Sequence, residues 1–246
     1  MRYEGLDPAA LSSRLQAPSC LALEKVTSTL DIVHELAGEG APNGTVVLAD
    51  EQVKGRGRQS RRWHSPKGSG IWMGNLRRPS TPVEGGLVAI RAGLAVARAL
   101  DTLAVVAQLK WPNDVMVHNR KLAGVLCEAR WRGQEVSWIA IGIGINVHGP
   151  LPQEIASRAI ALDEVLPGVT RLAVLDALMP WLRDLSDAPT LTEQECVEYA
   201  RSDWLQGRHI TAPVGGAVQG LDRDGALLVQ TAEGLERVVG GGVVTA

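Results

Sequence analysis

The fold is decided by residues 110–146, which read KWPNDVMVHNRKLAGVLCEARWRGQEVSWIAIGIGIN. Three parts of this stretch, and the segment before it, are rich in β-branched and other apolar residues, a composition typical of strands. The four expected strands are Ala104–Leu109, Val115–Val117, Leu122–Glu128 and Val136–Ile145. Asn119-Arg120 and Arg132-Gly133 are typical of hairpin turns between the later strands. The sequence therefore predicts a mixed, largely antiparallel sheet.

Helical patterns occur on both sides of this stretch. Ser28 and Asp31 have the Ser-x-x-acid spacing that caps a helix. Apolar residues at helical spacing predict helices over residues 28–37, 86–100 and, with a break or kink at Pro180, 162–205. Short strands are expected at Thr45–Ala49 and Ile71–Leu76. The fold class is α+β, with helices flanking the sheet.

The chain changes character after Gly207. Short β-type segments follow one another there, separated by the turn signals Asp224-Gly225 and Glu233-Gly234. This spacing predicts a small SH3-like β-barrel over residues 206–246, next to a larger domain over residues 1–205. A unit of about 40 residues is near the lower limit of independent stability, so it should pack against the larger domain.

Composition excludes several classes of function. The chain has 246 residues, a net charge of -2 and a pI of about 6.2, which argues against a global field for nucleic acid or membranes. Its three cysteines are few and far apart, as expected of reduced thiols in the cytoplasm. No apolar run is long enough for a membrane span. No two of the five histidines have helical metal-ligand spacing, and no phosphate-binding Gly-x-x-x-x-Gly-Lys-Ser/Thr motif occurs.

A basic loop stands out against this acidic background. Residues 54–63 read KGRGRQSRRW, with five cations, two glycines and one aromatic residue. Glycines let the backbone take conformations closed to other residues and approach a ligand closely, and arginine forks suit phosphate or carboxylate. A solvated basic loop is the alternative interpretation.

A second candidate site lies in the two arms of one predicted hairpin. Pro112 should direct Asn113 and Asp114 away from the strand, so that Lys110, Asp114 and Lys121 lie close together. A cation and a carboxylate placed in this way can hold an anionic ligand and Mg²⁺. The alternative is a surface hairpin with ordinary charges.

The third feature is the apolar strand around Gly142 and Gly144. Glycine at every second position removes the side chains from one face of a strand, which weakens it unless something packs flat there. A ligand and a closely packed backbone are equally good explanations of this pattern.

Four ordered motifs resemble those of the bacterial biotin protein ligases. They are GRGRxxRxW at 55–63, KWPND at 110–114, KLAG at 121–124 and GIGIN at 142–146. The resemblance implies a class II synthetase-like fold and a two-step reaction. Biotin and ATP form biotinyl-5'-adenylate, and a lysine of the biotin carboxyl carrier protein then takes the biotin as an amide. The family also has members with an N-terminal DNA-binding domain, and about 20 residues before the first strand are too few for one.

The resemblance also implies roles for individual residues. Lys121 would be the central catalytic cation, with Arg58 and Asp114 as further catalytic residues and Asp114 as the Mg²⁺ ligand. The implied biotin-binding residues are Ser28, Thr29, Gln52, Gly55, Arg56, Arg58, Lys121, Gly124 and Gly142. The implied ATP-binding residues are Arg56, Arg58, Trp63, Lys110, Asn113, Asp114, Lys121 and Asn146. The arginines would close the loop over the adenylate.

The chain departs from the family pattern at Leu30, where Asn is common, and no distinctive match occurs over 148–162. A lipoate or octanoate protein ligase of related fold is the alternative enzyme. A nucleic-acid-binding module that uses Lys54–Arg62 is the alternative from another class, and a single basic loop on an acidic chain argues against it. A homodimer through an exposed sheet edge is left open.

Overall fold

The structure is a computed structural model that describes residues 1–81 and 83–246. A seven-stranded sheet forms its centre, in the order β1-β2-β3-β7-β6-β5-β4. Its strands are β1 (Cys20–Val26), β2 (Val46–Gln52), β3 (Gly70–Arg77), β4 (Gln108–Lys110), β5 (Asp114–Val117), β6 (Arg120–Arg132) and β7 (Glu135–Asn146). Only β1 and β2 run parallel; the other neighbouring pairs are antiparallel. The predicted fold class is confirmed.

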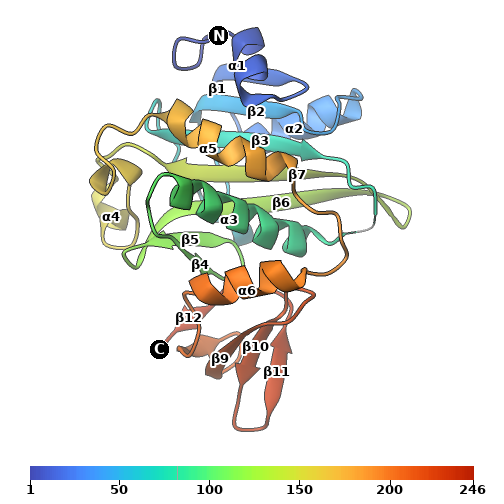
Figure 1. Ribbon diagram of the computed structural model, residues 1–246, viewed down its shortest axis with the longest axis vertical. Helices are drawn as coiled ribbons and strands as arrows, with labels where there is room; N and C mark the ends of the chain where they lie inside the picture. Colours follow the sequence, from blue (N-terminus) through green and yellow to red (C-terminus); the bar gives the residue numbers. More distant parts are fainter. Residues whose placement is uncertain (82) are drawn as a thin grey trace.

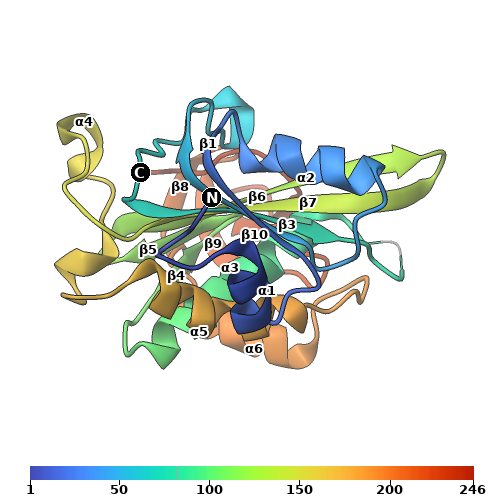
Figure 2. The same ribbon diagram turned by 90° about the horizontal axis from the view of Figure 1, so that it is seen from above.

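The helices lie in separate layers on the two faces of this sheet. They are α1 (Pro8–Leu15), α2 (Thr29–Gly38), α3 (Gly85–Thr102), α4 (Gln153–Ala156), α5 (Arg171–Arg183) and α6 (Glu193–Ser202). One face carries α2, and the opposite face carries α1, α3 and α5 (Figure 2). The loop that joins β2 to β3 lies on the α2 side, and residues 53–69 are called the β2–β3 loop below.

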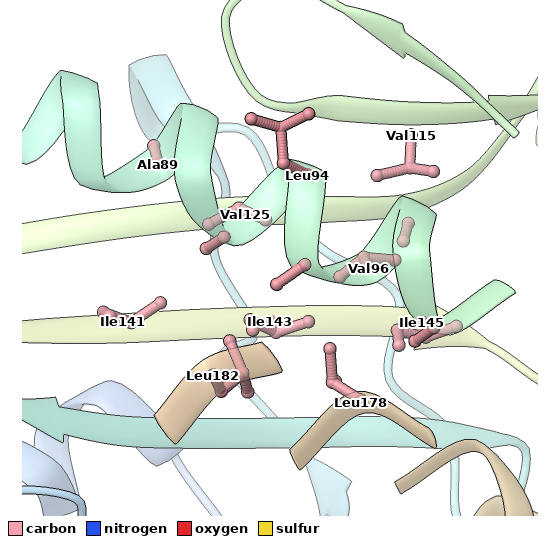
Figure 3. Close-up of a cluster of buried hydrophobic side chains, with 14 of the residues drawn as sticks. Ala89, Leu94, Val96, Val115, Val125, Ile141, Ile143, Ile145, Leu178 and Leu182 are labelled. Carbon is pink, nitrogen blue, oxygen red and sulfur yellow. The ribbon is translucent and has the colours of Figure 1, made fainter. Parts of the chain in front are cut away.

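Strand β7 shows how the sequence divides the two faces. Its isoleucines at 139, 141, 143 and 145 are buried with α3 and α5 in the main core (Figure 3). Alternate residues of a strand point to opposite faces, so Gly142, Gly144 and Asn146 lie on the α2 side. The same strand thus supplies a dense core on one face and almost no side chain on the other.

Helix α2 begins at the residue that the sequence predicts. Ser28 is its N-cap, and its hydroxyl accepts a hydrogen bond from the Leu30 backbone N–H. Asp31, however, does not complete a capping box. Its carboxylate binds the Arg56 guanidinium and accepts a hydrogen bond from the Thr27 hydroxyl.

Three sequence predictions were wrong in detail. Strand β4 covers Gln108–Lys110 and not 104–109, because a turn with Ala104 at φ of 59° follows the end of α3 at Thr102. The turn between β5 and β6 lies at His118 and Asn119, with φ of 48° and 60°, one residue before the predicted position. The helical region 162–205 is divided into α5 and α6, and α5 includes Pro180 in its last turn before it ends at Arg183.

A second sheet follows α6 and contains β8 (His209–Ala212), β9 (Gly216–Leu221), β10 (Leu227–Gln230), β11 (Leu235–Val238) and β12 (Val244–Thr245). Its antiparallel order is β11-β10-β9-β8-β12. It lies below α3 and α6 in Figure 1. The Trp111 indole N–H donates to the Gly225 carbonyl at 2.9 Å, and a Cβ on Gly225 would come within 2.8 Å of Ile90. These contacts join the small sheet to the β4–β5 turn and to α3.

None of the helices in residues 1–81 and 83–246 combines the length and the apolar character needed to cross a bilayer.

Candidate active site

The α2 side of the central sheet contains a cavity of about 860 Å³. The sheet forms its floor, the start of α2 forms one wall, and the β2–β3 loop covers it. Of the residues singled out in the sequence, the following line it: Ser28, Thr29, Gln52, Arg56, Arg58, Trp63, Lys110, Asn113, Asp114, Lys121, Gly124, Gly142 and Asn146. Gly55 lies in the loop but outside the lining. Four separate motifs therefore meet at one cavity.

Three glycines make the floor of this cavity flat. Gly124 on β6 is the register partner of Gly144 on β7, and Gly142 follows along the same face. A Cβ on Gly144 would lie 2.5 Å from the Trp63 indole, and one on Gly142 would lie 3.0 Å from Leu30. The side chains of Trp63 and Leu30 therefore pack where another backbone was the expected neighbour, and both glycines also line the cavity.

Lys121 and Asp114 form an ion pair at the centre of the floor. The Lys121 Nζ lies 2.5 Å from Asp114 Oδ1 and 5.1 Å from the centre of the Trp63 ring. The β5–β6 register brings the two residues together, because Asp114 pairs with Gly124 and Met116 pairs with Lys121. Main-chain hydrogen bonds join Lys121 to Arg158 and Ile160, which fixes the strand end that carries it. The predicted proximity of Lys110, Asp114 and Lys121 follows from this hairpin, because Lys110 pairs directly with Asp114.

One end of the cavity is lined by neutral polar side chains. Gln52 Oε1 accepts from the Thr29 backbone N–H at 2.9 Å and from its hydroxyl at 3.2 Å. Gln52 Nε2 donates to the Ser65 hydroxyl at 2.9 Å, and Ser28 is 2 % exposed. These groups hold one another in place and offer both donors and acceptors, which suits an uncharged polar ligand group.

In the basic loop, Gly55 is needed for close packing and not for an unusual dihedral angle. Neither Gly55 nor Gly57 has a positive φ, whereas Gln59 and Ser60 do, with φ of 55° and 58°. A Cβ on Gly55 would lie 2.6 Å from the Ser65 hydroxyl and 2.7 Å from the Trp63 carbonyl. Gly55 is therefore required by the close approach of the two loop arms, and the expectation of unusual backbone angles at these glycines was wrong.

Arg56 differs from the other cations of the loop. Its guanidinium binds both oxygens of Glu128 at 2.8 and 2.9 Å and Asp31 Oδ1 at 2.8 Å. Arg58, by contrast, forms no ion pair with the residues that the structure describes, and burial lowers its pKa although the Asp114 charge opposes this. Two arginines two positions apart thus have different surroundings.

Trp63 carries a buried polar group without a partner. Its indole Nε1 forms no hydrogen bond within residues 1–81 and 83–246. A buried N–H that lacks a partner costs free energy, so such a group commonly marks a ligand site or an ordered water. Trp63 lies against the glycine floor next to Lys121, and its Nε1 faces the backbone at Gly144.

Several residues at the far end of the cavity carried no signal in the sequence. Trp204, after α6, stacks with the Lys110 ammonium at 4.7 Å and the Arg208 guanidinium at 3.9 Å. Its indole N–H donates to Asn119 Oδ1 at 2.9 Å. Residues 241–243, between β11 and β12, also line the cavity. Gly144 was missed as a single residue, although the alternating glycines indicated it.

Positive charge exceeds negative charge at this end. Burial lowers the pKa of Lys110, the nearby charge of Asp114 opposes that shift, and the cations Lys121, Arg208 and Arg61 lower it further. Four cations thus share one carboxylate, which favours an anionic ligand with several charges. The amide nitrogens of Asn113 and Asn146 donate to the main-chain carbonyls of Val125 and Ile160.

The chain contains no group of three or more His, Cys, Asp or Glu residues that could hold a metal ion by itself, within the residues described. Asp114 is the carboxylate that the cavity offers. Mg²⁺ commonly binds through one or two carboxylates and substrate phosphates, so these surroundings fit an ion that arrives with a nucleotide.

Comparison with known families gives two matches. Residues 22–146 match the biotin/lipoate A/B protein ligase family, and residues 207–244 match the biotin protein ligase C terminal domain. The second match begins close to the start of the small sheet.

Individual relatives point the same way. The chain is 31% identical to the bifunctional ligase/repressor BirA of Bacillus subtilis over 87% of this chain and 70% of that protein. It is 31% identical to the biotin--[acetyl-CoA-carboxylase] ligase of Paracoccus denitrificans over 78% of this chain and 86% of that one. The biotin protein ligase of Aquifex aeolicus, solved with biotin and ATP, has a TM-score of 0.77 at 28% identity and covers 93% of this chain and 99% of its own.

Proposed function

The chain belongs to the biotin protein ligases, and on that premise we propose that its cavity activates biotin with ATP and transfers it to a lysine of a biotin carboxyl carrier protein. The observation that carries this proposal is the order of groups along one cavity. A neutral polar end, a glycine floor, the Lys121–Asp114 pair and a cationic end follow one another. Biotin and ATP, joined through carboxylate and α-phosphate, have the same order of chemical groups.

The polar end would bind the ureido ring of biotin. That ring has two N–H donors and one carbonyl acceptor, and the side chains of Ser28, Thr29 and Gln52 can match them. The dithiolane ring of lipoate and the alkyl chain of octanoate have no such groups. These two ligands would leave buried polar atoms without partners, which costs affinity. The polar end thus favours biotin over the second candidate substrates.

The first chemical step joins the two substrates. A carboxylate oxygen of biotin attacks the α-phosphorus of ATP, the bond from that phosphorus to the bridging oxygen breaks, and pyrophosphate leaves with the electron pair. Lys121 would lie beside both the carboxylate and the phosphate, where negative charge gathers in the transition state. A fixed cation that faces such charge is commonly the largest contribution to the rate.

The cations at the far end would hold the phosphates. Arg58 and Lys110 line the cavity, and burial already lowers the pKa of each. A bound phosphate would therefore relieve an unfavourable excess of positive charge. Mg²⁺, when bound with ATP, neutralises phosphate charge, and Asp114 would be its carboxylate ligand. Asn113 and Asn146 also line the cavity, and we assign them to its nucleotide end.

The second step moves biotin to the carrier. The neutral lysine amine attacks the acyl carbon of the adenylate, the bond from this carbon to the phosphate oxygen breaks, and AMP leaves. The reference pKa of a lysine is near 10.4, so the amine must lose a proton before attack, and we propose Asp114 as the acceptor of that proton. Closure by the β2–β3 loop would keep water away from the adenylate.

Residues 1–205 would carry this chemistry, and residues 206–246 would complete the far end through 241–243. Pyrophosphate release from MgATP tests the proposal before any carrier is added. We expect release only with biotin, and little with lipoate or octanoate at equal concentration. Release that does not depend on biotin, or that follows lipoate, would contradict it.

A further inference from the structure

The short segment that joins the two sheets lies against the cavity. Residues 203–208 follow α6 and precede β8. The main-chain N–H of Trp204 donates to the Leu109 carbonyl on β4 at 2.9 Å, and the main-chain N–H of Gly207 donates to the Val218 carbonyl on β9 at 3.0 Å. Main-chain bonds thus tie this segment to the central sheet on one side and to the second sheet on the other. Its Trp204 lines the cavity.

Further contacts fix the orientation of the Trp204 ring. Its indole N–H donates to Asn119 Oδ1 at 2.9 Å, and Asn119 lies in the β5–β6 turn. Arg208 Nε donates to the Trp204 main-chain carbonyl at 2.7 Å, and the Arg208 guanidinium lies 3.9 Å from the ring centre. Trp204 is only 9 % exposed. The residue is held at its main chain and at the N–H edge of its ring, so the ring face has a fixed position.

Lys110 has this ring face as a neighbour and no carboxylate of its own. Its register partner Asp114 is paired with Lys121 at 2.5 Å, and Lys110 forms no ion pair with the part of the chain that the structure describes. The Lys110 ammonium lies 4.7 Å from the centre of the Trp204 ring. An aromatic face attracts a cation, and the attraction grows where water is excluded. Because a lysine stem is flexible, a fixed ring face selects among its possible positions.

We propose that Trp204 is a positioning residue, whose ring face holds the Lys110 ammonium at the cationic end of the cavity, where the phosphates of ATP would bind. Both residues line the cavity. A lysine loses rotamer freedom when it binds a phosphate, and a ring that orders the side chain reduces this cost. Trp204 thus acts through Lys110 and not on the reacting atoms. The part of this inference that concerns ATP rests on the proposed function; the Lys110–Trp204 contact does not.

A double-mutant cycle on the KM for ATP tests the inference, with biotin-dependent pyrophosphate release as the assay. Trp204→Leu removes the ring face, and Lys110→Met removes the ammonium but keeps most of the stem. We expect each change alone to raise the KM for ATP several-fold to tenfold, with the KM for biotin near the parent value. In the Lys110→Met background, Trp204→Leu should add less than about twofold, because its effect requires the ammonium. Effects that multiply, or a lower kcat with an unchanged KM for ATP, would overturn the inference.

Two further variants separate the ring face from other effects of this side chain. Trp204→Phe keeps an aromatic face but loses the N–H that binds Asn119, so its KM for ATP should stay within about threefold of the parent. Trp181→Leu is the matched control, because the Trp181 ring lies 5.2 Å from the Arg98 guanidinium but does not line the cavity. It should leave the KM for ATP unchanged. A rise in either variant equal to that of Trp204→Leu would count against the positioning role.

Nuclear magnetic resonance of lysine-labelled protein gives a measurement that does not depend on catalysis. Protons that lie over an aromatic face resonate upfield, so the end of the Lys110 side chain should show such a shift. Trp204→Leu should abolish the shift, and Trp181→Leu should preserve it. A Lys110 signal at its ordinary position in the parent protein would overturn the inference. A parent protein without biotin-dependent pyrophosphate release would contradict the proposed function instead, so the two failures are distinct.

Discussion

Lys121 is the residue on which the chemistry depends most. It is held by main-chain bonds to Arg158 and Ile160, and its ammonium faces the cavity beside Asp114. Lys121→Met keeps most of the side-chain volume but removes the charge. We expect adenylate formation to fall by more than about a hundredfold, because transition-state charge loses its fixed partner. Biotin-dependent pyrophosphate release measures this.

The control for this change is Lys67→Met, which removes a cation from an exposed pair at the loop end. It should leave pyrophosphate release near the parent rate. A Lys121→Met protein that unfolds at the same urea concentration as the parent, yet forms adenylate at the parent rate, would contradict the role given to Lys121.

Gly144 tests the glycine floor. A single Cβ at this position would already meet the Trp63 indole at 2.5 Å, so Gly144→Val must displace Trp63. We expect calorimetry to detect no biotin binding by Gly144→Val, and tryptophan fluorescence to report a more exposed Trp63 ring. Gly133→Val controls for the introduction of a valine side chain elsewhere. Gly133 lies in the distant β6–β7 turn, and nothing lies near its Cβ position. Its φ of 63° strains any side chain. Biotin affinity equal to the parent in Gly144→Val would show that ligand does not use this face.

At the scale of the element, the segment after α6 joins β4 to the second sheet. The main-chain N–H of Trp204 donates to the Leu109 carbonyl. Asp203 Oδ1 accepts a hydrogen bond from the main-chain N–H of Leu205. Burial raises the pKa of Asp203 from its ordinary 3.8 to about 6. The other carboxylate oxygen and the nearby Tyr199 hydroxyl are both buried without partners in the described residues.

This carboxyl predicts a pH effect on stability. Between about pH 4 and pH 6 the folded protein keeps the proton on Asp203 and the unfolded chain does not, so stability falls as pH rises through this window. Asp203→Asn keeps the acceptor and removes the charge. It should be about 2 to 3 kcal/mol more stable than the parent at pH 7 and near equal at pH 4. Urea unfolding at both pH values measures the difference; the same gain at both would contradict it.

The elements best predicted from sequence are those with strong local signals. Helix α2 begins at its Ser28 cap, and β7 follows its alternating isoleucines. The strand predicted at 104–109 failed at its start because Ala104 and Val105 form the turn that closes α3, with their N–H groups on the Asp101 and Leu100 carbonyls. Buried Arg91 in α3 could not be predicted, because its partner Glu195 and three carbonyl acceptors lie about 100 residues away in sequence.

The sequence motifs indicated the part of the cavity that they themselves form, and not the residues that other segments contribute. Lys110, Asp114 and Lys121 lie on one hairpin, so local register brings them together. Trp204 and residues 241–243 reach the same cavity from the segment after α6 and from the segment between β11 and β12. Only the tertiary fold brings these together, and no local pattern could indicate them. The Arg56–Glu128 fork joins residues 72 apart and was missed for the same reason.

At the scale of the whole molecule, the cavity is an assembly of parts that lie far apart in the chain. The sheet supplies the floor, α2 one wall, the β2–β3 loop the cover and the second sheet the far end. The basic loop is therefore the cover of this cavity. This arrangement explains why a chain with a net charge of -2 concentrates cations at one place.

The most direct test of the central claim is mass spectrometry of a carrier protein after incubation with this protein, biotin and MgATP. The account predicts that one lysine of a biotin carboxyl carrier domain gains the mass of a biotinyl group, that omission of ATP abolishes this, and that Lys121→Met prevents it. An unmodified carrier, or a carrier that gains a lipoyl group when lipoate replaces biotin but none with biotin, would contradict the account.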